Sequence, residues 1–199
     1  MFTGIIQTVV LIISVAPKGD CLCVRIQKPA GWKLVLGQSM AIDGICSTVT
    51  LLRSSFLEVE YMPETLDKTT AGSFRKNTPV NLERSLTLRD FVDGHLVQGH
   101  VDARGTVRKR EGTENTREIT IAVPKELGKY IATKGSITVN GVSLTVAKAA
   151  KDTFRVALIP YTLTHTNLGL LKKGDSVNVE IDIIARYAEK ILRDTKKDN

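Results

Sequence analysis

Short runs rich in valine, isoleucine, leucine and threonine recur between turn-forming residues along the whole chain. This pattern is typical of an all-β sandwich or barrel, with little helix. In the first half it predicts strands near residues 5–15, 21–27, 38–43, 46–52, 56–61 and 79–84. In the second half it predicts strands near 100–109, 117–123, 135–140, 143–149, 153–159 and 176–181. Because closure removes exposed sheet edges, we expect two tandem six-stranded Greek-key β-barrels.

One stretch of the chain occurs twice. Residues 39–49 read SMAIDGICSTV and residues 136–146 read SITVNGVSLTV, an offset of 97 residues. The same offset aligns PETL at 63–66 with PYTL at 160–163, so the match extends well beyond one hairpin. A fixed offset over such a span indicates a duplicated domain.

The duplication divides the chain into two small domains and a tail. We expect homologous domains at 1–89 and 98–183, joined by a linker that crosses from barrel to barrel, and a tail at 184–199. Each domain has enough residues for a core of its own. The offset of 97 residues, carried to the start of each domain, places His100 on Thr3.

The tail has a different hydrophobic period. Ile184, Ala188, Ile191 and Leu192 follow the spacing of an amphipathic helix, and Asp182 is available as its N-cap. This helix has no counterpart in the first half. It either packs on its own barrel or contacts another subunit, and the second alternative is favoured because the barrels close without it.

Composition and charge restrict the class of protein. Hydrophobic residues make up 42% of the chain, and no apolar run approaches the roughly 18 to 20 residues that span a bilayer. We expect a soluble protein without a membrane partner, and residues 9–16 form a buried strand and not a signal peptide. The net charge of +7 suits polyanions, but the basic residues are not interleaved with aromatic ones, so we expect no nucleic-acid partner.

The cysteines and histidines form no metal-binding pattern. Cys21, Cys23 and Cys46 lack paired spacing, and their odd number argues against a disulfide framework, so a reducing cytoplasm is the expected location. The spacing of His95 and His100 fits no standard zinc site. A histidine beside a glycine can instead serve as a general acid or base, or lie on the surface without a role.

Polar side chains repeat at the return strand of each hairpin. Asp43-Gly44 and Asn140-Gly141 suit two-residue turns, so the flanking strands fold back and bring Ser39 near Cys46. On the return strands, alternate thiol and hydroxyl side chains share a face. They form either a hydrogen-bonding wall for a polar ligand or a hydroxyl ladder satisfied within the sheet. PETL and PYTL add hydroxyls and exposed backbone groups that can bind the edge of a heterocycle.

The motifs MFTGI, DGICSTV, PETL, VNLERSL, GHLVQGHVD, KGSITVNGVSLTV, IPYTL and VNVEID occur in this order. In combination they make residues 1–190 resemble the riboflavin synthase family. The resemblance implies a homotrimeric transferase that converts two molecules of 6,7-dimethyl-8-ribityllumazine into riboflavin and 5-amino-6-ribitylamino-uracil, the last step of riboflavin biosynthesis. It implies no cofactor or metal. It also implies a site between the N-terminal barrel of one subunit and the C-terminal barrel of its neighbour, with the tail helix assisting assembly.

The resemblance also implies site residues. The implied catalytic residues are Ser39, Cys46, His100 and Asp182, with Phe2 and Thr3 near the reacting centre. The implied N-terminal pocket comprises Gly4, Ile5, Ile6, Cys46, Ser47, Thr48, Glu60, Tyr61, Met62, Pro63, Glu64, Thr65, Gly99, His100 and Val101. The implied C-terminal pocket comprises Lys134, Ser143, Leu144, Thr145, Ile159, Pro160, Tyr161, Thr162, Leu163 and Thr164. Ser47 stands where the family usually has leucine, and we expect it to affect packing more than chemistry if it faces away from the pocket.

A second hypothesis is a non-catalytic relative that binds a lumazine or flavin as a chromophore. Such proteins keep the barrels and lose reactive polar residues, whereas this chain keeps Cys46, His95, His100, Ser143 and Thr145. The enzyme is therefore favoured over the chromophore protein.

Overall fold

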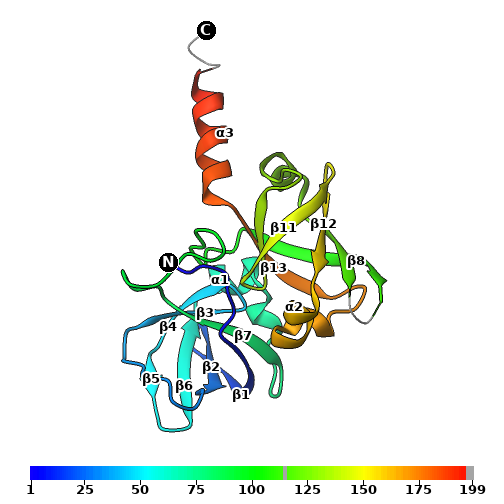
Figure 1. Cartoon of the computed structure of the whole chain (residues 1–199). Coiled ribbons are helices and arrows are strands. Elements are labelled where there is room, and N and C mark those ends of the chain that lie inside the picture. Colours follow the sequence, from blue (N-terminus) through cyan, green and yellow to red (C-terminus); the bar gives the residue numbers. More distant parts are fainter. Residues whose placement is uncertain (114–115, 196–199) are drawn as a thin grey trace.

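The computed structural model describes residues 1–113 and 116–195, which form two β-structures side by side (Figure 1). The strands of the first half are β1 (Thr8–Lys18), β2 (Cys21–Gln27), β3 (Ser39–Ile42), β4 (Ile45–Thr48), β5 (Leu51–Leu52), β6 (Phe56–Tyr61) and β7 (Pro79–Arg84). Those of the second half are β8 (Ala103–Gly112), β9 (Arg117–Ala122), β10 (Ser136–Val139), β11 (Val142–Ala149), β12 (Thr153–Leu158) and β13 (Ser176–Ile181). The predicted strands are thus confirmed, with boundaries that differ by up to three residues.

The two halves share one strand order and differ in closure. In the second half the strands follow the order β10-β11-β12-β9-β8-β13 and close into the expected six-stranded barrel. In the first half the order β4-β3-β7-β1-β2-β6-β5 gives a seven-stranded half-barrel sheet, the N-terminal barrel, because β4 and β5 are two pieces of the strand that is continuous as β11. The two residues between β4 and β5 still pair with their neighbours: the Val49 N–H donates to the Gln38 carbonyl beside β3, and the Thr50 N–H donates to the Glu58 carbonyl in β6.

Each half buries its own core. Ile12, Leu57 and Leu82 are fully buried in the first core, and Ile121 and Phe154 are almost fully buried in the second. Burial of one such side chain stabilises the fold by about 1.5–3 kcal/mol. The alternation of apolar and polar residues therefore accounts for two separate cores, as the duplication predicts.

Short helices connect the strands where the sequence pattern predicted none. They are α1 (Pro63–Lys68), η1 (Thr70–Ser73), η2 (Lys125–Tyr130), α2 (Pro160–His165) and η3 (Asn167–Leu170). Of these, α1 and η1 correspond to α2 and η3, whereas, among the described residues, η2 occurs in the second half alone. Pro63 and Pro160 occupy the first helical positions, where the missing N–H costs no hydrogen bond. PETL and PYTL are therefore the first turns of helices and not irregular backbone.

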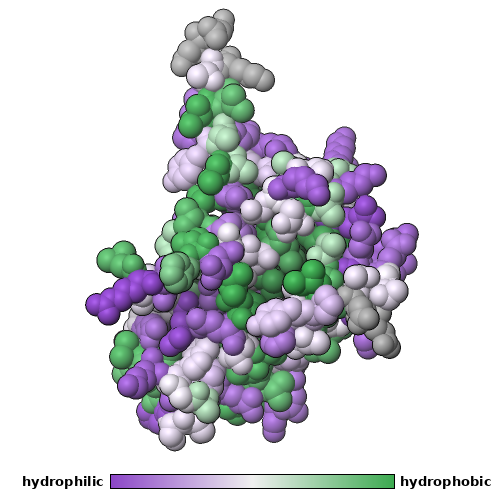
Figure 2. Space-filling model, in the orientation of Figure 1, coloured by the Kyte–Doolittle hydropathy of each residue, from purple (hydrophilic) through white to green (hydrophobic). Residues whose placement is uncertain are grey.

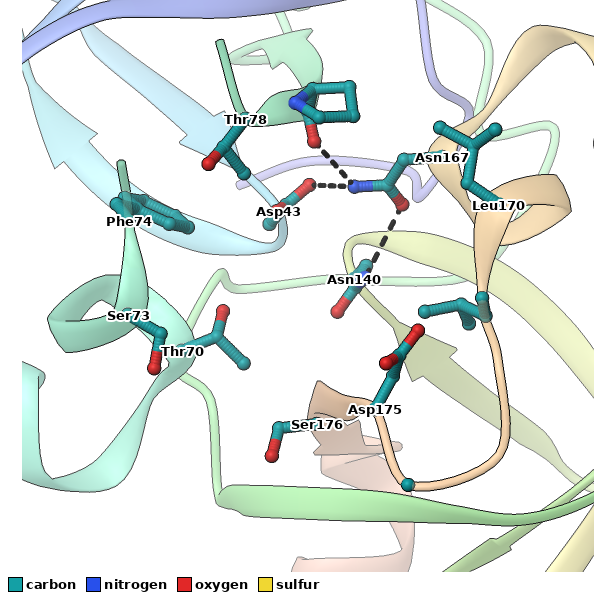
Figure 3. Close-up of a pocket in the computed structure, with 13 residues that line it drawn as sticks. Asp43, Thr70, Ser73, Phe74, Thr78, Asn140, Asn167, Leu170, Asp175 and Ser176 are labelled. Atoms are coloured by element: carbon teal, nitrogen blue, oxygen red, sulfur yellow. Dashed lines mark hydrogen bonds between the residues drawn. The ribbon is translucent and has the colours of Figure 1, made fainter. Parts of the chain in front are cut away.

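The two hairpin turns meet at the boundary between the halves. Asp43 and Asn140 have φ angles of 47° and 45°, as turns with positive φ at both central residues require. A Cβ atom on Gly44 would lie 2.7 Å from the backbone nitrogen of Gly141, so only glycine lets the turns approach this closely. Beside them lies an open cavity of about 440 Å³, shown in Figure 3 with Asp43, Asn140 and Asn167 among its lining residues.

The tail forms the helix α3 (Ile183–Thr195), which projects away from both barrels (Figure 1). Its start is capped as predicted, because the Asp182 Oδ1 atom accepts a hydrogen bond of 2.9 Å from the Ile184 N–H. Glu189 forms an ion pair with Lys129, but the helix buries none of its residues. Figure 2 shows apolar side chains along the helix. None of the helices in the described part of the chain is long and apolar enough to cross a membrane.

Candidate functional site

The two segments that precede β1 and β8 cross between the barrels. Ile6 packs against the core of the second half, whereas Val101 packs against the core of the first half. An antiparallel bridge between Phe2 and Val97 joins the segments where they pass each other, with N–O distances of 2.7 and 3.1 Å. The expected crossing is therefore present, and it is reciprocal.

The crossing corrects the repeat alignment at the start of each domain. Gly4 contacts Ser143 in the same way as Gly99 contacts Cys46, and both glycines have φ near +78°. The pairs Val10–Val80 and Gly105–Val177 give the same result along the sheets. The offset is thus 95 residues here, and the equivalence of His100 with Thr3 was wrong: His100 corresponds to Ile5. Two extra residues therefore lie in the second domain, between β9 and β10.

The N-terminal barrel and the second crossing segment enclose a cavity of about 280 Å³. Its lining residues are Ile45, Cys46, Glu64, Thr65, Lys68, Thr69, Gly99, His100 and Val101. Six of these residues were predicted for the N-terminal pocket. Sequence analysis missed Ile45, Lys68 and Thr69. Lys68 and Thr69 lie at the end of α1 and could have been found only by predicting that helix.

The backbone of Cys46 is hydrogen-bonded to the crossing segment that precedes β8. Its backbone N–H donates a hydrogen bond of 2.8 Å to the Gly99 carbonyl, and its half-buried side chain faces the cavity that His100 also lines. The predicted proximity of Ser39 to Cys46 is indirect: Ser39 pairs with Thr48, and Cys46 pairs with Ala41. Ser39 and Cys46 are therefore diagonal neighbours across the hairpin.

Several predicted residues of the N-terminal pocket lie elsewhere. Ser47 faces the barrel interior, where its hydroxyl lies 3.0 Å from the Tyr61 hydroxyl, in agreement with its expected packing role. Burial raises the pKa of Tyr61 well above its usual value. Glu60 forms an ion pair with Lys18 on the outer sheet face, and Met62 contacts Cys21. Thr48 and Pro63 are exposed.

The first residues of the chain belong to the other barrel. Gly4 was predicted for the N-terminal pocket, yet its carbonyl accepts a hydrogen bond of 2.7 Å from the Ser143 N–H. Ile6 packs on the C-terminal core, and the side chain of Ile5, between Gly4 and Ile6 in the sequence, is exposed. Phe2 and Thr3 are buried in the crossing. The reason is the reciprocal exchange of segments, which residue spacing alone does not reveal.

At the C-terminal barrel Ser143 pairs with a histidine that sequence analysis did not assign to the site. The Ser143 Oγ atom lies 2.7 Å from His95 Nδ1, and the Thr138 Oγ1 atom lies 3.2 Å from His95 Nε2. Burial lowers the pKa of His95, and the charge of Asp182 opposes this effect. A neutral imidazole beside a hydroxyl can accept its proton, which is the arrangement of an activated nucleophile.

A repeated dipeptide carried a signal for His95. Glycine precedes both histidines of GHLVQGH, and each glycine packs against a candidate reactive residue of one barrel. A Cβ atom on Gly94 would lie 2.9 Å from that of Ser143, and one on Gly99 would lie 2.8 Å from that of Cys46. Gly94-His95 therefore lies against Ser143 of the C-terminal barrel, and Gly99-His100 lies against Cys46 of the N-terminal barrel.

The other predicted residues of the C-terminal pocket lie before β10, on β11 and at α2. Lys134 has a φ angle in the left-handed region, and its backbone N–H donates a hydrogen bond to the Val146 carbonyl. Leu144 packs on the second core, whereas Thr145 is exposed. The remaining residues precede or form α2: Ile159, Pro160, Tyr161, Thr162, Leu163 and Thr164. Ile159 and Tyr161 are 61% and 65% exposed, so large apolar side chains stand open to solvent at this rim.

The described residues contain no group of three or more histidine, cysteine, aspartate or glutamate side chains that could hold a metal ion. The three cysteines are free thiols. The side chains at the two sites are the Cys46 thiol and the His100 imidazole at one, and the Ser143 hydroxyl and the His95 imidazole at the other.

Comparisons with known proteins agree on one type of domain. The profile of the lumazine binding domain matches residues 3–85 and 98–182. The riboflavin synthase of Actinobacillus pleuropneumoniae is 39% identical, over 96% of this chain and 90% of its own length. That of Bacillus subtilis is 36% identical over the same shares of the two chains. A crystal structure of LumP complexed with riboflavin superposes with a TM-score of 0.84 at 26% identity, and covers 91% of this chain and 99% of LumP.

Proposed function

Because the chain belongs to the riboflavin synthase family, we propose that it converts two molecules of 6,7-dimethyl-8-ribityllumazine into riboflavin and 5-amino-6-ribitylamino-uracil. The observation that carries the proposal is the duplication itself. Two copies of one domain offer two pockets of one kind, and the reaction consumes two copies of one heterocycle. On this basis the protein is a transferase that moves a four-carbon unit between identical substrates.

The two sites supply different groups for the two substrates. The acidic 7-methyl group of one lumazine needs a base, and C7 of the other ring accepts a nucleophile. We assign the nucleophile to Ser143, whose proton passes to Nδ1 of the neutral His95 2.7 Å away and returns when the adduct breaks. Cys46 and His100 line the cavity of the N-terminal barrel, where His100 serves as the base for the methyl group.

The remaining implied catalytic residues take supporting roles. The charge of Asp182 acts on His95 and favours the imidazolium that forms when His95 receives the proton. Ser39 lies on the same face as Cys46, two pairs along the hairpin, where its hydroxyl is available to the ribityl chain. Orientation of the two rings supplies most of the acceleration, an effect that can reach about 7–11 kcal/mol.

The defining experiment is incubation of the pure protein with 6,7-dimethyl-8-ribityllumazine while flavin absorbance and fluorescence are recorded. Release of riboflavin in a ratio of one flavin to two lumazines is the expected result. Binding of the lumazine without any flavin product would leave the second candidate, a chromophore-binding protein. The similarity to LumP favours that candidate, but the identity is 26%, against 36–39% for the synthases.

Single substitutions at the N-terminal site should lower turnover without loss of the fold. We expect Cys46→Ala and His100→Gln each to reduce kcat by about 100-fold, the lower end of the range for one proton-transfer group. The matched control is Cys21→Ala, on the outer face of β2. Steady-state kinetics with thermal unfolding measures both effects. Variants with wild-type kcat would contradict the assignment.

We further propose that three subunits assemble through α3. The apolar stripe of this helix is 62–65% exposed at Ile184, Tyr187, Ile191 and Leu192, and no described residue covers it. The exposed apolar rim of the C-terminal pocket suits a site that a neighbouring subunit closes. A cytoplasmic location remains a prediction based on the three free thiols.

Removal of the apolar stripe should dissociate the assembly. We expect the double substitution Ile184→Ser and Ile191→Ser to convert trimer into monomer at micromolar concentration, because the exposed apolar area of the helix is lost. The control double substitution, Lys190→Ser with Asp194→Ser, removes an ion pair from the same helix. Sedimentation velocity distinguishes the species, and an unchanged sedimentation coefficient in the first variant would refute this role of α3.

A further inference from the structure

Two buried carboxylates lie outside the groups assigned to chemistry. Glu83 on β7 and Glu180 on β13 are 3% and 5% exposed. Burial raises the pKa of Glu180 to about 7 and also raises that of Glu83. A buried carboxyl group is costly unless hydrogen bonds satisfy it, so the partners of these two residues indicate what they do.

Both carboxylates bind the backbone of a crossing segment. The Glu83 carboxylate accepts hydrogen bonds from the N–H groups of Thr3 and Gly4, at 2.7 and 3.0 Å. The Glu180 carboxylate accepts them from Gln98 and Gly99, at the same two distances. Each glutamate therefore fixes two consecutive amides of the segment that precedes the first strand of its own barrel.

Each glycine whose N–H binds a glutamate also forms a hydrogen bond to the opposite barrel through its carbonyl. The Gly4 carbonyl accepts the Ser143 N–H at 2.7 Å, and the Gly99 carbonyl accepts the Cys46 N–H at 2.8 Å. One bridge runs from Glu83 in the N-terminal barrel to Ser143 in the C-terminal barrel. The other runs from Glu180 in the C-terminal barrel to Cys46 in the N-terminal barrel.

These hydrogen-bonded bridges restrict the backbone conformation of the two crossing segments at Gly4 and Gly99. Both glycines adopt φ angles in the left-handed region, and a Cβ atom on Gly4 would lie 2.6 Å from that of Ser143. A backbone held on one side by a carboxylate and on the other by a strand can move only if the strand moves with it. The position of each reactive residue is thus tied to a carboxylate of the other barrel.

We propose that Glu180 is a positioning residue for the Cys46 site and Glu83 is a positioning residue for the Ser143 site, each acting across the barrel boundary through one glycine. Neither glutamate takes a part in the chemistry itself. The consequence for turnover rests on the proposed function, whereas the coupling between barrels does not. Each site is completed by the other barrel, so neither domain positions its reactive residue alone.

Amide hydrogen exchange of the resting protein tests the coupling directly. Glu180→Gln keeps the shape of the side chain but turns an N–H donor toward one of the two bound amides. We expect exchange at the Cys46 amide to accelerate by about tenfold or more, with the Ser143 amide unchanged. Glu83→Gln should give the reverse pattern. The control is Glu58→Gln, a glutamate that is 8% exposed and pairs with Arg25, away from both segments.

Three outcomes would overturn the proposal. Faster exchange confined to β13 in Glu180→Gln would indicate a role within its own barrel only. Equal acceleration at Cys46 and Ser143 would indicate general destabilisation, and no change at either amide would indicate no coupling. If Glu180→Gln does not fold, Glu180→Asp keeps the charge and the acceptors at shorter reach, and a smaller acceleration at Cys46 is expected.

The exchange pattern is independent of the proposed reaction, because no substrate is present. If the protein forms no riboflavin, the proposed function fails while the exchange pattern still decides the positioning role. If riboflavin forms, we expect Glu180→Gln and Glu83→Gln each to lower kcat, with Glu58→Gln at the wild-type value.

Discussion

Replacement of Gly99 by alanine is expected to reduce turnover by about 100-fold or more and to destabilise the fold by about 2–4 kcal/mol. The new Cβ atom would lie 2.8 Å from the Cys46 Cβ atom and 3.0 Å from the ring of Phe2, at a residue with φ of +78°. Relief of this overlap displaces Cys46 and the following His100 together. Misplacement of two groups costs more than removal of one, because orientation supplies most of the expected acceleration.

Gly37 provides a matched control for this substitution. Its φ angle is +80°, and a Cβ atom on it would meet no other atom within 4 Å. Gly37→Ala therefore introduces the backbone strain alone, about 1–2 kcal/mol, and should keep the turnover of the wild type. Urea unfolding and steady-state kinetics on the two variants separate strain from overlap. Equal losses of stability, with turnover retained in Gly99→Ala, would show that the crossing segment does not set the geometry of the site.

The strands could be predicted from the sequence because their signals are local. Alternating apolar residues mark the faces of each strand, and Asp43-Gly44 and Asn140-Gly141 specify the tight turns between them. The short helices α1 and α2 could not be predicted from periodicity, because six residues show less than two full turns. Only the proline at their first position gave a signal, and it was interpreted as a source of exposed backbone groups and not as the start of a helix.

The candidate site was predicted less completely, because it depends on contacts between distant segments. The grouping of Cys46, Thr65 and His100 followed from the family resemblance, and the structure places these residues around one cavity. The exchange of the segments around Gly4 and Gly99 has no local signal. It depends on hydrogen bonds to Glu83 and Glu180, which lie about 80 residues away in the sequence. The constant offset of the hairpin repeat also hid the two extra residues of the second domain, between β9 and β10.

The hairpin turns differ in one titratable group, which gives the boundary between the barrels a pH dependence. The Asp43 Oδ1 atom accepts hydrogen bonds from the Asn81 N–H at 2.7 Å and from Asn167 Nδ2 at 2.9 Å. Asn140 takes the equivalent place in the second half, where its Oδ1 atom accepts the Asn178 N–H at 2.8 Å. Figure 3 shows Asp43 and Asn140 on either side of Asn167. Burial raises the pKa of Asp43 to about 7.

The sign of the pH effect follows from this raised pKa. Below about pH 4 the carboxyl group of Asp43 is protonated in the folded and unfolded chains alike, so its contribution to stability is fully present. Between about pH 4 and pH 7 the unfolded chain releases the proton and the folded chain keeps it, so stability falls with rising pH. Above the folded pKa of about 7 the loss is complete. Its size is on the order of 4 kcal/mol, at about 1.4 kcal/mol for each pKa unit.

Asp43→Asn should therefore stabilise the protein at pH 8 and leave it nearly unchanged at pH 4. The asparagine Oδ1 atom can accept the two bonds that Asp43 accepts, and it does not titrate. Asn140 Oδ1 already accepts the equivalent backbone bond, from Asn178, at the other turn. Urea unfolding at pH 4.5, 6 and 8 measures the effect, and the difference between variant and wild type cancels the contribution of Glu180, whose pKa is also near 7. Asn140→Asp is the reverse control and should add a second loss of stability with rising pH. A difference between Asp43→Asn and wild type that stays constant from pH 4.5 to 8 would mean that Asp43 is ionised throughout. The boundary between the barrels would then tolerate a buried charge that the amides of Asn81 and Asn167 alone stabilise.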